Sequence, residues 1–193
     1  MTTPEPSDFR EGVPFLGGAL WIDLLNTQPV IGGQVLDLIG GEGPLQNWAR
    51  LAGLGHGEAP SSEDVAGAQT LRDALRPVFD DLAKGLPVRT AAVQAVNAVL
   101  AGVTVTRRLE EGRLVEEERL ATGPVAAAAA LDFARFLSDH EPARLRHCSN
   151  PACTMVFYDR GKNNRRRWCS MQACGNRAKV ASYRERKAAR EEE

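Results

Sequence analysis

The four cysteines of this chain lie within one short segment, and their spacing limits how that segment can fold. They form two pairs, Cys148 with Cys153 and Cys169 with Cys174, and four residues separate the members of each pair. Four thiolates at such spacing can close a tetrahedral Zn²⁺ site with Zn–S distances of about 2.3 Å. Because a closed four-thiolate site leaves no position for a reactive water, the pattern predicts one structural zinc ion.

Disulfides, a redox switch and an iron–sulfur cluster are the alternatives to zinc. The N-terminal segment 1–15 is polar and proline-rich, and it lacks the basic and apolar regions of a signal peptide. We therefore expect a cytoplasmic protein, in which thiols stay reduced and clustered cysteines favour a metal. His147 is a substitute ligand that a four-cysteine site does not require. Since the segment has few large apolar side chains, zinc would contribute on the order of 10 kcal/mol to its folding.

The charge of the chain is divided unevenly along its length. Residues 1–143 contain 11 Lys and Arg against 20 Asp and Glu, whereas residues 144–193 contain 13 against 5. The net charges are therefore −9 and +8. A basic module beside an acidic one indicates a polyanionic partner, with solvated surface charge as the alternative. No apolar run reaches the roughly 18 residues of a membrane-spanning helix, so we expect no membrane partner.

The chain before the cysteines is predicted to hold a flexible arm, 1–14, and a mostly helical domain, 15–142. Apolar residues at helical spacing, together with capping residues and terminal glycines, indicate four helices. These helices are expected within segments 41–55, 61–85, 88–102 and 125–140.

Three local features add detail to this domain. Pro77 is expected to kink or split the helix that contains it. Alternating β-branched residues on both sides of Glu111-Gly112 predict a β-hairpin over 103–120. The apolar segment 15–29 fits either a short helix or a buried strand, because periodicity does not separate the two.

The cysteine-rich module, 143–193, is predicted to combine short strands with a terminal helix. Segments 154–159 and 165–170 are expected to pair as the two strands of a hairpin. A helix is expected to follow from Met171 to about residue 190.

The terminal helix completes the expected fold. Its Val180 and Tyr183 are expected to pack on the hairpin. A knuckle, a hairpin and a helix that carries the last ligands follow the order of a treble-clef zinc finger. The predicted fold class is therefore α+β, with a mostly helical N-terminal domain that contains a β-hairpin, followed by a small treble-clef zinc finger.

Basic residues are concentrated in the predicted turn and terminal helix of this module. The candidate nucleic-acid contacts are Arg160, Lys162, Arg165, Arg166, Arg167, Asn176, Arg177, Lys179, Arg184, Arg186 and Lys187. Arginine suits bidentate contacts to phosphate or guanine, so hairpin arginines are expected to grip the backbone while the helix enters the major groove. Arg177, beside the ligands, is the residue best placed to balance the negative charge of four thiolates.

Two further residues of the module have two interpretations each. Trp168 either forms the core of the small module or stacks on an exposed base, and the scarcity of other large apolar groups favours the core. Asn176 either contacts a base or bonds the local backbone at the start of the helix.

The segment WCSMQACGNRAKVASYRERK, residues 168–187, resembles the CGNR zinc-finger family, whose motif stands here as Cys174-Gly175-Asn176-Arg177. The resemblance extends back through CSNPACTMVFYD, and the upstream LWIDLLNT is similar to the opening of the ABATE domain of bacterial stress-induced transcription regulators. This resemblance implies a treble-clef DNA-binding module and an N-terminal ligand sensor. Arg160-Gly161 and Arg165 depart from the small hydroxyl residues expected in the turn, so a hydroxyl contact to phosphate is not carried over.

The expected function is that of a DNA-binding transcription regulator whose N-terminal domain senses a small-molecule effector or forms a homodimer. Asp23, Asn26 and Thr27 are candidate polar groups of an apolar ligand pocket, although Asn26 and Thr27 also fit a role in capping or turning the chain. RNA binding and binding of an acidic protein surface, as an adaptor, are the rival functions. The sequence has no catalytic constellation, no phosphate-cradling glycine loop and no open metal site, so we do not expect an enzyme.

Overall fold

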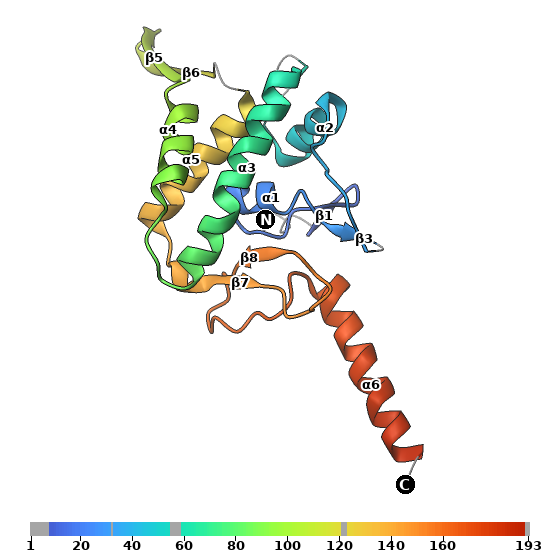
Figure 1. Cartoon of the computed structure of the whole chain (residues 1–193). Coiled ribbons are helices and arrows are strands. Elements are labelled where there is room, and N and C mark those ends of the chain that lie inside the picture. The colour runs from blue at the N-terminus through green and yellow to red at the C-terminus, as the bar shows by residue number, and fades with distance from the viewer. Residues whose placement is uncertain (1–7, 32, 55–58, 121–122, 192–193) are drawn as a thin grey trace.

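The computed structural model describes residues 8–31, 33–54, 59–120 and 123–191 (Figure 1). The helices of these ranges are α1 (Leu20–Leu25), α2 (Glu42–Ala52), α3 (Ser62–Ala83), α4 (Thr90–Leu100), α5 (Pro124–Asp139) and α6 (Asn176–Glu191). The strands pair two by two and antiparallel, as β1 (Phe9–Arg10) with β2 (Val13–Pro14), β3 (Val30–Ile31) with β4 (Gln34–Val35), β5 (Val103–Glu110) with β6 (Arg113–Leu120), and β7 (Leu145–His147) with β8 (Val156–Tyr158). The predicted α+β class is confirmed.

The main core forms where the short helix α1 packs against the long helices α3 and α5, which also contact each other (Figure 1). Trp21 of α1 is fully buried, and its ring lies 5.9 Å from that of Phe79, 5.1 Å from Phe133 and 5.2 Å from Phe136, centroid to centroid. Burial of four aromatic rings at one point stabilises the packing of all three helices. Of the two interpretations of segment 15–29, the short helix is the one observed.

The four helices predicted in the N-terminal domain correspond to α2, α3, α4 and α5. Helix α3 begins with a capping box, in which the Ser61 hydroxyl accepts from the Asp64 backbone N–H and the Asp64 carboxylate accepts from the Ser61 backbone N–H. The helix continues past Pro77 as one element, so the expected split does not occur.

The predicted hairpin over 103–120 is confirmed as β5 and β6, joined by Glu111 and Gly112. Both turn residues have positive φ, 46° and 78°, which is the geometry that a two-residue hairpin turn requires. This hairpin extends from one end of the helical body (Figure 1), and its Leu109 and Leu114 are 76% and 66% exposed.

Part of the segment expected to be a flexible arm is ordered. Residues 8–14 form the small β1–β2 hairpin, in which the Phe15 N–H donates to the Asp8 carbonyl at 2.9 Å. The Arg10 guanidinium also donates to the Leu51 carbonyl at 2.5 Å, which ties the hairpin to the end of α2. The rest of the predicted arm, 1–7, lies outside the described residues.

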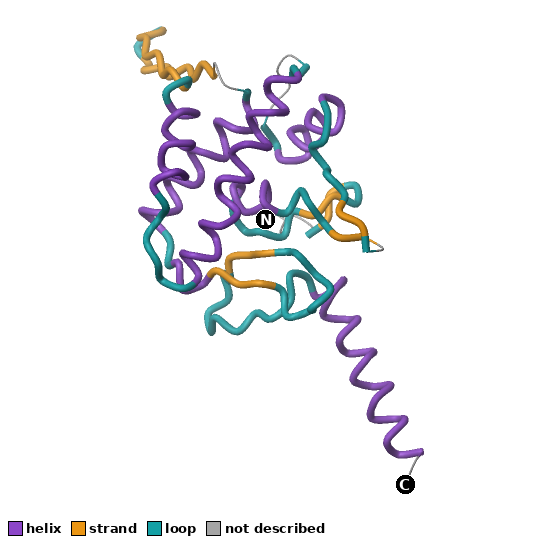
Figure 2. Tube along the Cα trace, viewed as in Figure 1, coloured by secondary structure: helices purple, strands orange, loops and turns teal. Residues whose placement is uncertain are grey.

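The strand pairing predicted for the cysteine-rich module is wrong. Strand β8 pairs with β7, which precedes the first cysteines, with Leu145 opposite Tyr158 and His147 opposite Val156. Segment 165–170 forms a loop instead of a strand, and Figure 2 shows the stretch between β8 and the last helix as loop. The buried side chains of Leu145, Val156 and Tyr158 belong to the main core, so the module is built onto the helical body.

Helix α6 extends away from the rest of the molecule (Figure 1). A five-residue π-helical turn, η2 (Met171–Gly175), leads into it. The expected packing of Val180 and Tyr183 on a hairpin is wrong, because these side chains are 49% and 61% exposed. None of the helices in the described ranges has the length and apolar character needed to cross a membrane.

Candidate metal centre and nucleic-acid surface

The first cysteine pair is held by a tight turn between β7 and β8. The Cys153 N–H donates to the Asn150 carbonyl at 2.9 Å, and the Ala152 N–H donates to the Asn150 side-chain carbonyl at 3.1 Å. The Cys148 N–H donates to the Met155 carbonyl at 3.1 Å, which continues the β7–β8 pairing into the turn. Asparagine favours such turns because its side chain bonds the backbone two residues on.

The second pair comes from the loop and from η2. The Ser149 N–H donates to the Arg167 carbonyl at 2.8 Å, which brings the loop against the first pair. A Cβ atom at Gly175 would lie 2.6 Å from the Met171 sulfur and 3.4 Å from the Trp168 ring. A side chain at the position after Cys174 would therefore displace the end of the Met171 side chain. Trp168 is partly buried against the cysteine cluster, as its core interpretation expects.

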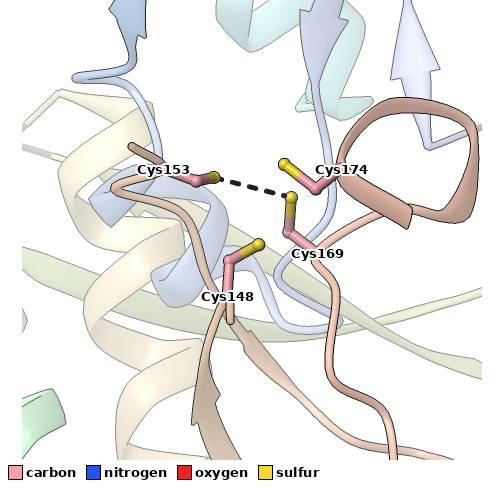
Figure 3. Close-up of side chains that lie close together, drawn as sticks. All are labelled: Cys148, Cys153, Cys169 and Cys174. Carbon is pink, nitrogen blue, oxygen red and sulfur yellow. Dashed lines mark hydrogen bonds between the residues drawn. The ribbon is translucent and has the colours of Figure 1, made fainter. Parts of the chain in front are cut away.

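The four sulfurs converge on one point (Figure 3). They all lie within 4.8 Å of one another, and the Sγ atoms of Cys153 and Cys169 are 3.8 Å apart. Sulfurs at the corners of a zinc tetrahedron with bonds of about 2.3 Å are about 3.8 Å apart. The donor set and its spacing fit one structural zinc ion, and the predicted cofactor is confirmed.

The surroundings of the sulfurs support the same assignment. The Asn150 side-chain amide donates to the Cys174 sulfur at 3.4 Å, as an outer partner of a metal-bound thiolate does. His147 is not part of the cluster, because its Nε2 lies 2.8 Å from a carboxylate oxygen of Asp80. Cys148, Cys169 and Cys174 are buried and Cys153 is half-buried.

The thiols of the cluster influence one another's ionisation. The hydrogen bond from Cys169 lowers the pKa of Cys153 to about 5. The same hydrogen bond, with burial, raises the pKa of Cys169, and burial raises the pKa of Cys174. Since zinc binds thiolates, its binding releases protons and weakens as the pH falls.

Two of the arginines predicted to contact nucleic acid are bonded within the protein. The Arg160 guanidinium donates to the Gly18 carbonyl. The Arg166 guanidinium lies over the Phe157 ring, 4.4 Å from its centroid, and donates to the Trp168 carbonyl at 3.0 Å and to the Cys169 carbonyl. These two side chains therefore hold the loop in place.

The other residues predicted to contact nucleic acid have exposed side chains. In the loop these are Lys162, Arg165 and Arg167, and on the last helix they are Asn176, Arg177, Lys179, Arg184, Arg186 and Lys187. The Arg167 guanidinium lies over the Trp168 ring, 5.1 Å from the ring centroid. The loop and the last helix thus both present exposed basic groups.

Asp159, which the sequence analysis does not single out, organises this loop. Asp159 is 1% exposed, and its carboxylate accepts from the backbone N–H groups of Gly161 and Arg166, both at 2.8 Å. An aspartate two residues before a glycine is a known turn signal, and it could have indicated this role.

The three residues predicted to line a ligand pocket are buried and bonded inside the protein. The Asn26 side chain donates to the Val156 carbonyl and accepts from the Val156 N–H, both at 2.9 Å. The Thr27 hydroxyl donates to the Leu24 carbonyl at 2.7 Å and accepts from the buried Arg72 guanidinium at 2.9 Å. The bond from Thr27 to Leu24 is local, whereas the Asn26 bonds join two segments that lie far apart in the sequence.

Asp23 occupies an unusual position for a carboxylate. It is buried, and one of its oxygens accepts from the Gly17 N–H at 2.7 Å. Burial raises the pKa of Asp23 to about 7 against the lowering effects of this hydrogen bond and of Arg10 and Arg160, and nearby Asp132 adds to the rise. The carboxyl group is thus bound to the backbone of its own domain.

Two family models match the chain in consecutive segments. Residues 18–140 match the ABATE family, described as "putative stress-induced transcription regulator", and residues 144–187 match the CGNR zinc finger. The order is the one expected from the sequence, and all four clustered cysteines lie within the second match. A search of curated proteins finds no match to the chain.

Proposed function

Since the chain belongs to the ABATE family and carries a CGNR zinc finger, we propose that it is a transcription regulator that binds DNA. The observation that carries the proposal is the exposed basic set on the loop and on α6, beside a metal site that fixes where the helix starts. Between residues 160 and 190 there are eleven Arg and Lys against one acid, Glu185. This excess exceeds what a four-thiolate zinc site, with a formal charge of −2, requires.

The shape of α6 supports binding in the major groove. The helix has 16 residues, so it is about 24 Å long. It extends from the body without a covering element in the described residues (Figure 1). The major groove is about 12 Å wide and admits one α-helix. In this arrangement the loop side chains Lys162, Arg165 and Arg167 contact backbone phosphates and exposed groups of the helix face the base edges.

The exposed apolar groups of α6 have a place in the same arrangement. Val180 and Tyr183 lie three residues apart on the helix and are largely exposed. Apolar side chains in the major groove contact the thymine methyl group, and tyrosine also bonds phosphate. These two residues and Asn176 are therefore the candidates for sequence reading.

Selection of bound sequences from random duplex DNA with zinc-loaded protein tests the proposal. We expect an enriched motif, and a titration of the selected duplex in which log K falls with log salt at a slope near −4.5 for about five phosphate contacts. A library without enrichment, or a slope near zero, would refute sequence-specific electrostatic binding.

RNA binding and an adaptor role are the competing functions. Structured RNA that displaces the selected duplex at equal concentration would favour RNA. A protein partner that stays bound after nuclease treatment would favour the adaptor role.

We also propose that the N-terminal domain responds to a small-molecule effector in the cytoplasm. We further propose that the chain forms a homodimer, which sedimentation of the zinc-loaded protein would test. The family matches give no support for an enzyme.

A further inference from the structure

A cavity of about 410 Å³ lies between the N-terminal hairpins and the zinc module. Its N-terminal wall includes Pro14, Leu16, Ile31, Leu36 and Leu38. Its other wall includes three of the zinc ligands, so part of the volume lies beside the metal site. The residues of this wall are Asn150, Ala152, Cys153, Thr154, Met155, Cys169, Ala173, Cys174 and Arg177. A volume above 300 Å³ is in the range of sites that hold small organic molecules.

The walls of this cavity are mostly apolar. Ile31 and Leu36 have large apolar side chains that line the mouth of the cavity, and these side chains are 62% and 49% exposed. Exposure of such groups costs free energy that an apolar occupant would recover. The cavity therefore favours a ligand with an apolar body.

The polar lining groups single out one residue. The Thr154 hydroxyl already donates to the Gln28 carbonyl at 3.4 Å, and the Asn150 side chain is already bonded to Ala152 and to Cys174. Arg177 is exposed, and it has no hydrogen-bond or ion-pair partner among the described residues. Among the described residues that line the cavity, it is the only ionisable one apart from the cysteines.

A single cation on an apolar wall complements a single anionic group on an apolar molecule. We propose that this cavity binds an amphipathic organic monoanion, such as an aromatic or aliphatic carboxylate or sulfonate. Its apolar body contacts Leu36 and Ile31, and its anionic group pairs with Arg177. This site differs from the buried Asp23, Asn26 and Thr27 cluster, whose polar groups are used by the protein itself.

The position of the site connects the ligand to the finger. The occupant touches the N-terminal hairpins and the first turn of α6 at once, and it engages an arginine of the proposed DNA surface. Its role as an effector rests on the proposed function, because the anion competes with phosphate for Arg177. Binding of the anion itself does not depend on DNA.

Two fluorescent probes with the same ring system test the site on the zinc-loaded full chain. The monoanion is 1-anilinonaphthalene-8-sulfonate, and N-phenyl-1-naphthylamine lacks the sulfonate. We expect saturable 1:1 binding of the sulfonate, about fivefold tighter than binding of the neutral probe. Arg177→Gln should remove this difference, and Leu36→Trp, which fills the mouth of the cavity, should weaken binding of both probes more than tenfold.

Arg184→Gln is the matched control, because Arg184 lies on α6 but outside the cavity lining. It should weaken DNA binding and leave the sulfonate titration unchanged, so failure of the DNA proposal and failure of this one give different results. Equal binding of the two probes would overturn the anion preference. Unchanged binding in both Leu36→Trp and Arg177→Gln, or binding only after zinc removal, would overturn the site.

Discussion

The side chain of Asn26 forms two hydrogen bonds with the backbone of Val156, one to its carbonyl and one from its N–H, both 2.9 Å long. The amide thus takes the place of a neighbouring strand along the free edge of β8. Asn26 lies in the segment that matches ABATE and Val156 lies in the segment that matches the zinc finger. The two family segments therefore share one core and one hydrogen-bond network.

Asn26→Ala should destabilise the whole chain by about 3 kcal/mol. The substitution leaves a buried N–H and a buried carbonyl of Val156 without partners, and each such group costs about 1–3 kcal/mol. Urea denaturation followed by circular dichroism measures the change. Asn97→Ala, at an exposed position of α4, is the control and should change the midpoint little. Equal midpoints for the two variants would contradict the structural role of Asn26.

Removal of zinc should destabilise the helical body as well as the finger. Leu145, Val156 and Tyr158 belong to the main core, and they lie on β7 and β8, whose connection holds the first two zinc ligands. Cys169→Ser should lose the bound zinc and lower the melting temperature of the chain in one transition, because zinc contributes on the order of 10 kcal/mol to such modules.

The control for zinc removal is Ser149→Ala, which changes an exposed side chain next to Cys148. It should retain one zinc per chain by metal analysis and melt like the parent protein. Two separate transitions in Cys169→Ser, with the helical body unchanged, would show that the two segments fold independently.

Local chemistry made much of this fold predictable. The zinc ligands follow from spacing alone, since two short loops can each direct two thiolates to one ion. The β5–β6 turn follows from Glu111-Gly112, because glycine accepts positive φ. The start of α3 follows from Ser61 and Asp64, whose side chains bond backbone groups only three residues away.

Features that depend on distant contacts were not predictable. The apolar sequence of strand β8 fits pairing with segment 165–170 as well as with β7. Burial of Leu145 in the main core favours β7 as its partner. Arg166 and Arg167 are adjacent and identical in the sequence, yet one is bonded to two carbonyls and the other is exposed. The sequence around Asn26 suggests only a role in capping or turning the chain. Its true partner lies 130 residues away, so neighbouring residues do not reveal it.

Stability should fall as the pH rises from about 4 to about 7, because of Asp23. Its folded-state pKa of about 7 exceeds the ordinary value of 3.8, so the folded protein holds a proton in this window that the unfolded chain releases. Asp23→Asn keeps an acceptor for the Gly17 N–H and removes the ionisation. The variant should be more stable than the parent at pH 8, by up to about 4 kcal/mol.

Denaturation curves at pH 5 and pH 8 measure the effect of Asp23. The gain from Asp23→Asn should be smaller at pH 5, about 1.6 kcal/mol, because pH 5 lies only about one unit above the ordinary pKa of 3.8 at which the unfolded chain ionises. Asp139→Asn, at an exposed position near the end of α5, should have the same free energy of unfolding as the parent protein at both pH 5 and pH 8. A gain that is equal at pH 5 and pH 8 would show that ionisation of Asp23 is not its cause.

Arg166 and Arg167 should respond differently to the same substitution. Arg166→Gln removes the stack on Phe157 and two charged hydrogen bonds to carbonyls, so it should lower the free energy of unfolding by about 2–3 kcal/mol. Arg167→Gln removes an exposed charge and its stack on Trp168, so it should change stability by less than about 1 kcal/mol. It should instead weaken DNA binding and make the salt slope shallower by about one.

Measuring both properties on both variants separates structure from binding. Each variant serves as the control for the other, because the two differ by one position in the same loop. We expect Arg166→Gln to shift the midpoint of urea denaturation, and Arg167→Gln to shift the salt slope of DNA binding. An unaltered slope in Arg167→Gln would remove this arginine from the phosphate contacts, and an unaltered midpoint in Arg166→Gln would contradict its role in holding the loop.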